Sequence, residues 1–351
     1  MRVTARRSFS CNVSHSCPVG IHIRRYLWLL LYWKARIDTN MRAITYSRFG
    51  GPDVLELTEL PEPKVGPDSV LVRVHASSVN PVDWKVREGH LDPIMDSVFP
   101  VIPGWDVAGV VEQVGLDTPE FRVGDEVFGY VRKDVVGGTV AGGTFAELVA
   151  APVRTLAHKP ATWSFEQAAA VPLAGLTAYQ TTHRAGVQHD HTVLIHAAAG
   201  GVGSFAVQIA RSIGARIIGT ASEDNHQYLR SLGAEAITYG EGIVERVREL
   251  APEGVDVVLD YVGGDALDPV PDVLRDGGTV ASITDARARD EFGGHYIWVR
   301  PDVADLTELA RLGDAGELVP EIAEVFDLAE AAAAHRRSES GHVRGKIVVR
   351  M

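Results

Sequence analysis

Cysteine is almost absent from this sequence. The 351 residues include two cysteines, Cys11 and Cys17, and none follows residue 17. A regular strand pattern begins at Met41, and from there onward a disulfide within the chain is impossible. This fits a cytoplasmic setting.

Positive charge and long apolar runs are scarce as well. The net charge is −12, and no basic stripe follows residue 40. Because the phosphate backbone of a nucleic acid needs a basic face, these charges exclude nucleic acid as the main partner. The apolar run Tyr26–Trp33 is far shorter than the ~20 residues that a membrane-spanning helix needs. We therefore expect neither a nucleic-acid partner nor a membrane partner.

Residues 1–40 differ from the rest of the chain. They hold seven Lys or Arg side chains, one acidic side chain and both cysteines. No small-residue cleavage site follows their apolar run, as a signal peptide would require. We interpret this segment as an extension outside the fold, with Met41 as the favoured initiator. A membrane-surface or targeting extension is the alternative.

Residues 41–163 have the pattern of a compact β domain, antiparallel or barrel-like. Short apolar runs alternate with turn signals such as the sequence from Gly50 to Asp53, and no helix of clear period is expected before Ser164. The expected strands are Arg42–Tyr46, Val70–His75, Val107–Val114, Glu126–Gly129 and Phe145–Ala150.

From Ser164 to about residue 319, strands alternate with helices, which predicts βαβ units and a parallel sheet. A last helix and strand, Asp327–Ser338 and Lys346–Arg350, are expected to return to the first domain within residues 320–351. The other expected helices are Phe165–Ala170, Leu176–His183, one after residue 202, Asn225–Leu232, Gly242–Leu250 and Asp265–Leu274. The expected strands are Thr192–His196, Arg216–Thr220, Ala236–Thr238, Val255–Asp260 and Thr279–Ile283.

One motif carries the cofactor prediction. Ala198, Gly200, Gly201, Val202 and Gly203 lie between a strand and an amphipathic helix, in a G-x-G-x-x-G pattern whose first glycine is alanine. Gly200 allows the backbone to approach a pyrophosphate, and Gly203 allows the helix to pack closely on the strand. The helix N-terminus then offers N–H groups to the phosphates. The motif predicts dinucleotide binding.

The end of the next strand indicates which dinucleotide is bound. A carboxylate there would bind the ribose of NAD, but this strand ends with Thr220 and Ser222, small donors suited to a 2′-phosphate. We therefore expect NADP(H). Glu223 and Asp224 follow at once, so a Glu223 side chain pointing into the pocket would favour NAD instead.

Several motifs, in order, show a family resemblance from Met41 to the C-terminus. The chain resembles the medium-chain dehydrogenase/reductase superfamily, in its zinc-free quinone oxidoreductase branch. The resemblance implies an α/β protein with a GroES-like β domain, a Rossmann domain with a doubly wound parallel sheet and a cleft between them. The matching stretches are Asn80–Lys85, Pro103–Gly109, Gly124–Gly129, Gly143–Glu147, Ala174–Tyr179, the glycine turn, Asp260–Gly264 and Gly345–Val348.

Zinc-containing members of this superfamily have a cysteine at the position of Asn80. They have Gly-His-Glu where this chain has Gly104, Trp105 and Asp106. Without later cysteines, neither the catalytic nor the structural zinc site can be built from its usual ligands. His75, His90 and Asp106 are weak alternatives as ligands, and we expect no metal.

The resemblance places Asn80 near the nicotinamide and the substrate. Lys85 is the nearest cation in sequence and is expected to stabilise or protonate a developing oxyanion, although a solvated surface lysine is the equal alternative. Asp83 either orients Lys85 or caps a turn. Trp84 and Tyr130 either form walls for a flat substrate or belong to the core.

The resemblance also implies the remaining cofactor contacts. Thr177 is expected on the nicotinamide side and Tyr239 beside the adenine. Tyr261, Val262 and Gly263 are expected under the nicotinamide ribose, and Lys346 is a further contact.

Without a metal to polarise an alcohol, an activated acceptor is the better substrate. We therefore predict an NADPH-dependent reductase of a quinone or α,β-unsaturated carbonyl. The alternatives are an enoyl-thioester reductase and a non-catalytic NADPH-binding redox sensor. A small molecule is the expected partner, and a homodimer is an open expectation because many relatives are dimers.

Overall fold

The computed structural model describes residues 40–133, 136–137 and 142–351. The expected N-terminal extension, apart from Asn40, lies outside these residues. Within the described residues, no helix combines the length and the apolar character that crossing a membrane requires.

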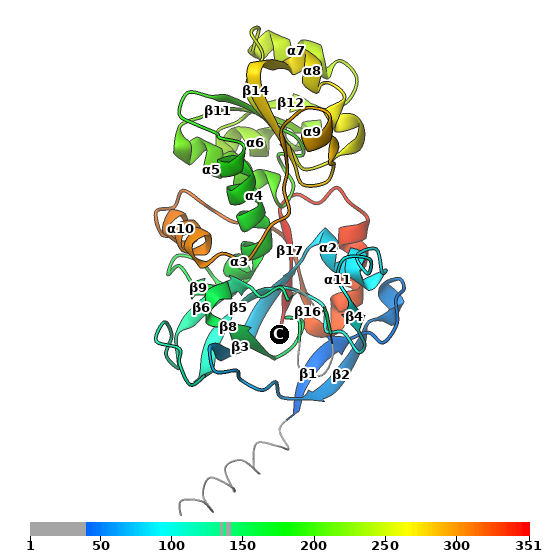
Figure 1. Ribbon diagram of the computed structural model, residues 1–351, viewed down its shortest axis with the longest axis vertical. Helices are drawn as coiled ribbons and strands as arrows, with labels where there is room; N and C mark the ends of the chain where they lie inside the picture. The colour runs from blue at the N-terminus through cyan, green and yellow to red at the C-terminus, as the bar shows by residue number, and fades with distance from the viewer. Residues whose placement is uncertain (1–39, 134–135, 138–141) are drawn as a thin grey trace, which may run out of the picture. The chain divides into compact units, whose positions relative to one another are not determined.

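Most strands of a seven-stranded sheet come from residues 69–158 (Figure 1). Its central strand, β3 (Ser69–Val79), pairs antiparallel with β5 (Asp106–Val114), β8 (Leu148–Pro152) and β17 (Lys346–Arg350). The C-terminal strand therefore lies beside a strand formed nearly 270 residues earlier. The other strands of this sheet are β6 (Glu126–Tyr130), β9 (Leu156–His158) and β16 (Ile322–Asp327).

Two short sheets and two single turns complete this region. The pairs are β1 (Asn40–Thr45) with β2 (Glu56–Pro61), and β4 (Ser97–Val98) with β7 (Val136–Gly137). The single turns are 3₁₀ helices, η1 (Pro52–Val54) and η2 (Val153–Thr155).

A six-stranded parallel sheet follows, in the order β12-β11-β10-β13-β14-β15. The strand order reverses direction at β10, so the topological switch point lies between β10 and β13. Open α/β sheets bind ligands at such a point, beyond the carboxyl ends of the strands. The strands are β10 (Thr192–Ile195), β11 (Arg216–Ala221), β12 (Glu235–Thr238), β13 (Val255–Asp260), β14 (Leu274–Ser282) and β15 (His295–Tyr296).

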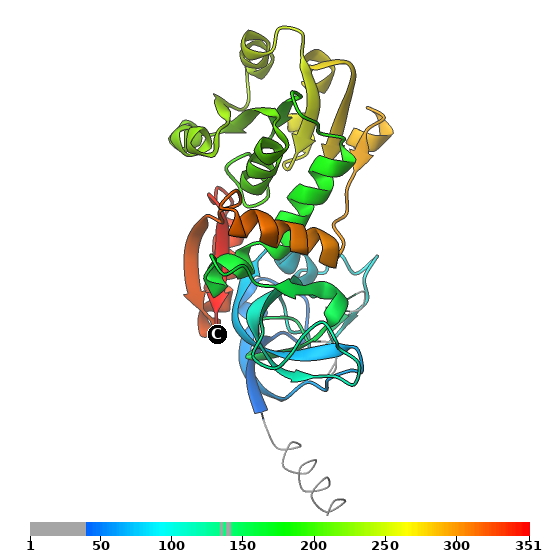
Figure 2. The same ribbon diagram turned by 90° about the vertical axis from the view of Figure 1, so that its left-hand side faces the viewer.

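Helices cover both faces of this sheet, which explains its nearly continuous apolar strands. In β10, Val193 and Ile195 pack in the core shared with α5, whereas Leu194 packs in a second core with Ile243 of α7. Figure 2 shows helices on either side of the strands. The helices of this region are α3 (Phe165–Ala170), α4 (Pro172–Arg184), α5 (Gly203–Ile213), η3 (Glu223–Asn225), α6 (His226–Leu232), α7 (Ile243–Leu250), α9 (Arg287–Asp290) and α10 (Val303–Asp314).

The structure corrects three sequence expectations. A helix, α2 (Pro81–Arg87), precedes Ser164, and its single short face gives too little periodicity to detect. The helix expected over Asp265–Leu274 is instead η4 (Gly264–Leu267) and α8 (Val270–Val273), because Pro269 and Pro271 interrupt it. Strand β16 was not expected, and it precedes the expected last helix, which is confirmed as η5 (Leu328–Glu330) followed by α11 (Ala331–Glu339).

A buried arginine joins α2 to α11. The Arg87 guanidinium is fully buried and donates to the Gly50 carbonyl at 2.8 Å, to His335 Nδ1 at 2.9 Å and to Glu339 Oε1 at 2.8 Å. Because a guanidinium only donates, His335 must accept at Nδ1 and carry its proton on Nε2. Burial, together with the Arg87 charge, lowers the pKa of His335 to about 3, so this histidine is neutral. The contact fixes the two helices that flank the cavity described next.

Candidate active site

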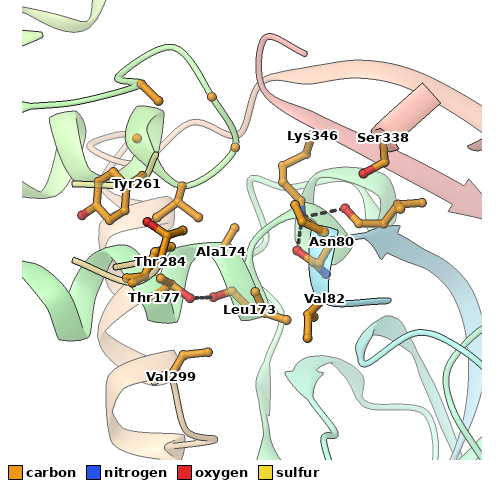
Figure 3. A pocket seen from close by; sticks show the side chains of 18 of the residues that line it. Asn80, Val82, Leu173, Ala174, Thr177, Tyr261, Thr284, Val299, Ser338 and Lys346 are labelled. Carbon is orange, nitrogen blue, oxygen red and sulfur yellow. Dashed lines mark hydrogen bonds between the residues drawn. The ribbon is translucent and has the colours of Figure 1, made fainter. Parts of the chain in front are cut away.

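A cavity of about 540 Å³ lies where the two large sheets meet the C-terminal segment (Figure 3). Its walls come from the start of α2, the first turns of α4, the glycine turn before α5, the segment 296–299 and the segment 338–347. None of the described residues that line it is Asp or Glu, although the chain carries a net charge of −12. Lys85 and Lys346 both line it. The cavity therefore suits a negatively charged occupant.

The glycine turn forms one end of this cavity. Ala197, Gly200, Gly201, Val202 and Gly203 all line it. A Cβ on Gly203 would lie 2.2 Å from the Ala197 oxygen, and one on Gly201 would lie 2.9 Å from Cδ of Lys346. The turn thus brings bare backbone and the N-terminus of an 11-residue helix to the cavity. These features fit the pyrophosphate of a dinucleotide.

Asn80 and Lys346 both line the cavity and are hydrogen-bonded to each other. Lys346 Nζ donates to the Val79 carbonyl at 3.1 Å and to Asn80 Oδ1, as Figure 3 shows. On its other side, Asn80 Nδ2 donates to Asp106 Oδ2 at 2.7 Å. The lysine fixes which side of the amide carries the oxygen, because an ammonium only donates.

The Asp83 carboxyl group interacts with the same asparagine, Asn80, and not with Lys85. Its Oδ2 accepts from the backbone N–H of Asn80 at 2.7 Å and thereby stabilises the first turn of α2. The carboxyl is buried, and this burial raises its pKa to about 7, with the Asp106 charge adding to the effect. Burial also raises the pKa of Asp106 and lowers that of Lys346.

The raised pKa of Asp83 predicts a pH-dependent stability difference. Because the folded pKa lies above the model value of 3.8, the Asp83 contribution to stability is lost as pH rises from about 4 to about 7. In Asp83→Asn the amide oxygen still accepts from Asn80. We expect the free energy of unfolding of this variant, relative to wild type, to increase by roughly 3 kcal/mol between pH 5 and pH 8.

Urea unfolding of both proteins at the two pH values measures this change. Groups that titrate independently of Asp83 contribute equally to both proteins and cancel in this comparison. A difference that stays constant with pH would show that the Asp83 carboxyl titrates normally.

The residues predicted on the substrate side do not all reach the cavity. Lys85 and Tyr130 line the cavity, whereas Trp84 is not among the described residues that line it. Trp84 instead contacts Lys85, whose Nζ lies 5.5 Å from the centre of the indole ring. Tyr130 is buried and packs edge-on against Trp105, which also lines the cavity.

The expected cofactor residues divide into two groups. Thr177 and Lys346 line the cavity together with the glycine turn. Thr220 is buried and its Oγ1 accepts from the Ala197 N–H at 3.2 Å, so it supports the turn from behind. The structure does not bring the following residues to the cavity wall: Ala198, Thr220, Ser222, Tyr239, Val262 and Gly263.

Ser222 and its acidic neighbours directly follow the C-terminal end of β11. The Ser222 hydroxyl accepts from Asn225 Nδ2 at 3.0 Å, and Glu223 is exposed at the start of η3. This arrangement leaves the choice between NAD and NADP at the level of a prediction.

Some functional candidates escaped the sequence reasoning. Tyr261, which the resemblance places under the nicotinamide ribose, does line the cavity. The unexpected lining residues are Ile283 and Thr284, which follow the end of β14, and the segment from Tyr296, the last residue of β15, to Val299. Their position beyond carboxyl ends of parallel strands is the signal that could have found them. Asp106 was considered only as a weak metal ligand, and its hydrogen bonds give it another role.

The residues at the family's zinc position do not fit zinc. Asn80 Oδ1 is occupied by the Lys346 ammonium, a cation that would repel the metal. Both oxygens of Asp106 accept hydrogen bonds from protein groups. In the described ranges no three His, Cys, Asp or Glu side chains form a group suited to a metal.

Comparison with known proteins relates this chain to dehydrogenases and reductases. Residues 66–161 match the family described as the alcohol dehydrogenase GroES-like domain, and residues 232–349 match the one described as zinc-binding dehydrogenase.

Two curated relatives are similar over most of the chain. The chain is 35% identical over 321 residues to the chloroplastic NADPH-dependent alkenal/one oxidoreductase of Arabidopsis thaliana, covering 90% of this chain and 81% of the relative. It is 34% identical to 2-methylene-furan-3-one reductase of Solanum lycopersicum, covering 89% and 80%.

Among solved structures, the quinone oxidoreductase from Coxiella burnetii is similar, with a TM-score of 0.79 and 35% identity. The match covers 89% of this chain and 100% of that one.

Proposed function

Because this chain belongs to the medium-chain dehydrogenase/reductase family, among its quinone and alkenal oxidoreductases, we propose that it reduces quinones or α,β-unsaturated carbonyl compounds with NADPH and without zinc. One observation carries the proposal: a continuous cavity that contains both groups of residues. It joins a dinucleotide turn at Gly200–Gly203 to Asn80, Lys85 and Lys346, and its described lining includes no carboxylate.

The dinucleotide would be held by this chain's own groups. The turn and the N-terminus of α5 would bind the pyrophosphate. Thr177 and Asn80 would contact the nicotinamide half, because both line the cavity outside the glycine turn that would hold the pyrophosphate. When bound, the reduced nicotinamide supplies a hydride to an electron-poor carbon of the substrate.

Lys85 would complete the reaction on the substrate side. Hydride addition to the β-carbon of an enone leaves an enolate, and addition to a quinone leaves a hydroquinone anion. The Lys85 ammonium stabilises the developing oxyanion and gives one proton to the substrate. The balance is one enone, one NADPH and one proton giving the saturated ketone and NADP⁺.

The neighbouring walls suit a flat, apolar substrate. Trp105, Tyr130 and Trp298 present aromatic surface to the cavity, and Leu91 and Val299 add aliphatic surface. Such walls exclude water from the reacting carbon and strengthen the electrostatic effect of Lys85.

Steady-state oxidation of NADPH and NADH, in parallel, with a naphthoquinone and with a simple enone in EDTA tests the proposal. Turnover with NADPH that survives chelation is the expected result. Preference for NADH would indicate a ribose contact by Glu223. Tight NADPH binding without turnover on any acceptor would favour the sensor alternative, and turnover only on an enoyl thioester would favour the enoyl reductase.

A further inference from the structure

One fully buried carboxylate, that of Asp106, connects three separate elements. Asp106 opens β5 and has no exposed surface. Its Oδ2 accepts from Ser78 Oγ on β3 at 2.6 Å and from Asn80 Nδ2 at 2.7 Å, and its Oδ1 accepts from the Leu173 N–H at 2.7 Å.

The hydrogen bond to Leu173 links β5 of the seven-stranded sheet to α4, a helix of the parallel-sheet region. Leu173 lies in the first turn of α4, where backbone N–H groups have no partner within the helix. A carboxylate from β5 satisfies one of them and also interacts favourably with the helix dipole. The same turn brings Leu173, Ala174 and Thr177 to the cavity.

The bond to Asn80 fixes the opposite wall. Asn80 is held from one side by Asp106 and from the other by Lys346, so its amide has one permitted orientation. Reversing the amide would place its NH₂ group against the Lys346 ammonium and its oxygen against a carboxylate. One residue therefore sets the separation between Asn80 and the first turn of α4.

We propose that Asp106 is a positioning residue that sets the separation between two walls of the nicotinamide half of the cavity. These walls are Asn80 and the first turn of α4. This inference rests on the proposed dinucleotide binding and adds to it. Asp106 is not among the described residues that line the cavity, so it acts through Asn80 and α4 and not by touching the cofactor. The adenine half, beyond the glycine turn, does not depend on it.

Asp106→Asn tests this division. The new amide oxygen can still accept from Leu173, but its NH₂ group would face the NH₂ group of Asn80. We expect the dissociation constant for NADPH, measured by calorimetry or by fluorescence of the bound nucleotide, to increase more than tenfold. The affinity for adenosine 2′,5′-bisphosphate, which lacks the nicotinamide half, is expected to stay within twofold of wild type.

Ser77→Ala is the matched control. Ser77 Oγ donates to the Asp106 backbone carbonyl at 2.7 Å and is equally buried, but it leaves the carboxylate untouched. We expect it to lower Tm by roughly 2–4 °C without changing either affinity. A merely structural role of Asp106 would instead make both variants alike.

Asp106→Ala repeats the measurement without two opposed amides, in case the asparagine variant does not fold. Equal loss of affinity for both nucleotides, or loss for neither, would overturn the inference while leaving the proposed function intact. If wild type itself did not bind NADPH, the proposed function would fail first, and this inference with it.

Discussion

Replacing Lys85 with methionine is expected to lower kcat with a naphthoquinone or an enone by roughly 10²–10³-fold. Methionine keeps an unbranched side chain of similar length in the cavity wall but removes the charge and the proton. The KM for NADPH is expected to change less than threefold, because the proposed cofactor contacts are Lys346 and the glycine turn, which line the same cavity. Steady-state kinetics with each substrate varied separately measures this difference.

Two further variants separate charge from proton transfer. Lys85→Arg keeps the cation but cannot release its proton near neutral pH. If Lys85 acts mainly by stabilising the oxyanion, the arginine variant retains much of kcat, and if it acts mainly by proton transfer, the arginine variant resembles the methionine variant. Lys64→Met, at an exposed lysine that does not line the cavity, is the control for loss of one positive charge. A Lys85→Met enzyme with at least half of the wild-type kcat would remove Lys85 from the reaction.

The sequence predicted the parts of the site that depend on local pattern. The glycine turn follows a buried strand and opens an amphipathic helix, so short-range periodicity is enough to locate it. The alternation of strands and helices after Ser164 gave the parallel sheet for the same reason. The family resemblance then supplied the expected α/β architecture with its GroES-like and Rossmann regions, which the comparisons and the sheet topology support.

The meeting of Asn80, Asp106 and Lys346 could not be derived from local pattern. Lys346 reaches Asn80 across 266 residues of sequence because β17 pairs with β3, and no periodicity reports that pairing. The position of Asp106 in the family motif suggested only a weak metal ligand. Its actual partners include a backbone N–H of α4, which only the folded chain reveals.

The donors expected for a 2′-phosphate illustrate a related limit. Thr220 and Ser222 carry small hydroxyl groups near the end of a strand, but position along a strand does not determine where a hydroxyl points. In the fold, Thr220 points back to the Ala197 N–H and Ser222 interacts with Asn225. Side-chain direction depends on the backbone of the turn that follows, and that turn has no distinct sequence signature.

Replacing Gly203 with alanine is expected to weaken NADPH binding by at least roughly 100-fold and to lower stability. The added Cβ would lie 2.2 Å from the Ala197 oxygen and 2.7 Å from Cα of Ala198. Both contacts are with backbone, so no side-chain rotation relieves them. The helix must move away from β10, and its N–H groups then leave the position that the pyrophosphate requires. Calorimetric titration with NADPH and thermal unfolding measure the two effects.

Two other glycines make this experiment discriminating. A Cβ on Gly51 meets no atom within 4 Å and its φ is −68°, so Gly51→Ala should bind NADPH and unfold as wild type does. A Cβ on Gly200 meets only the Ala197 oxygen, at 3.3 Å, but would project at the cavity wall. Gly200→Ala is therefore expected to lose affinity with little loss of stability, whereas Gly203→Ala loses both. If Gly203→Ala bound NADPH normally, the turn would not hold the pyrophosphate, and the cavity would have to bind its ligand through Lys346 and Asn80 alone.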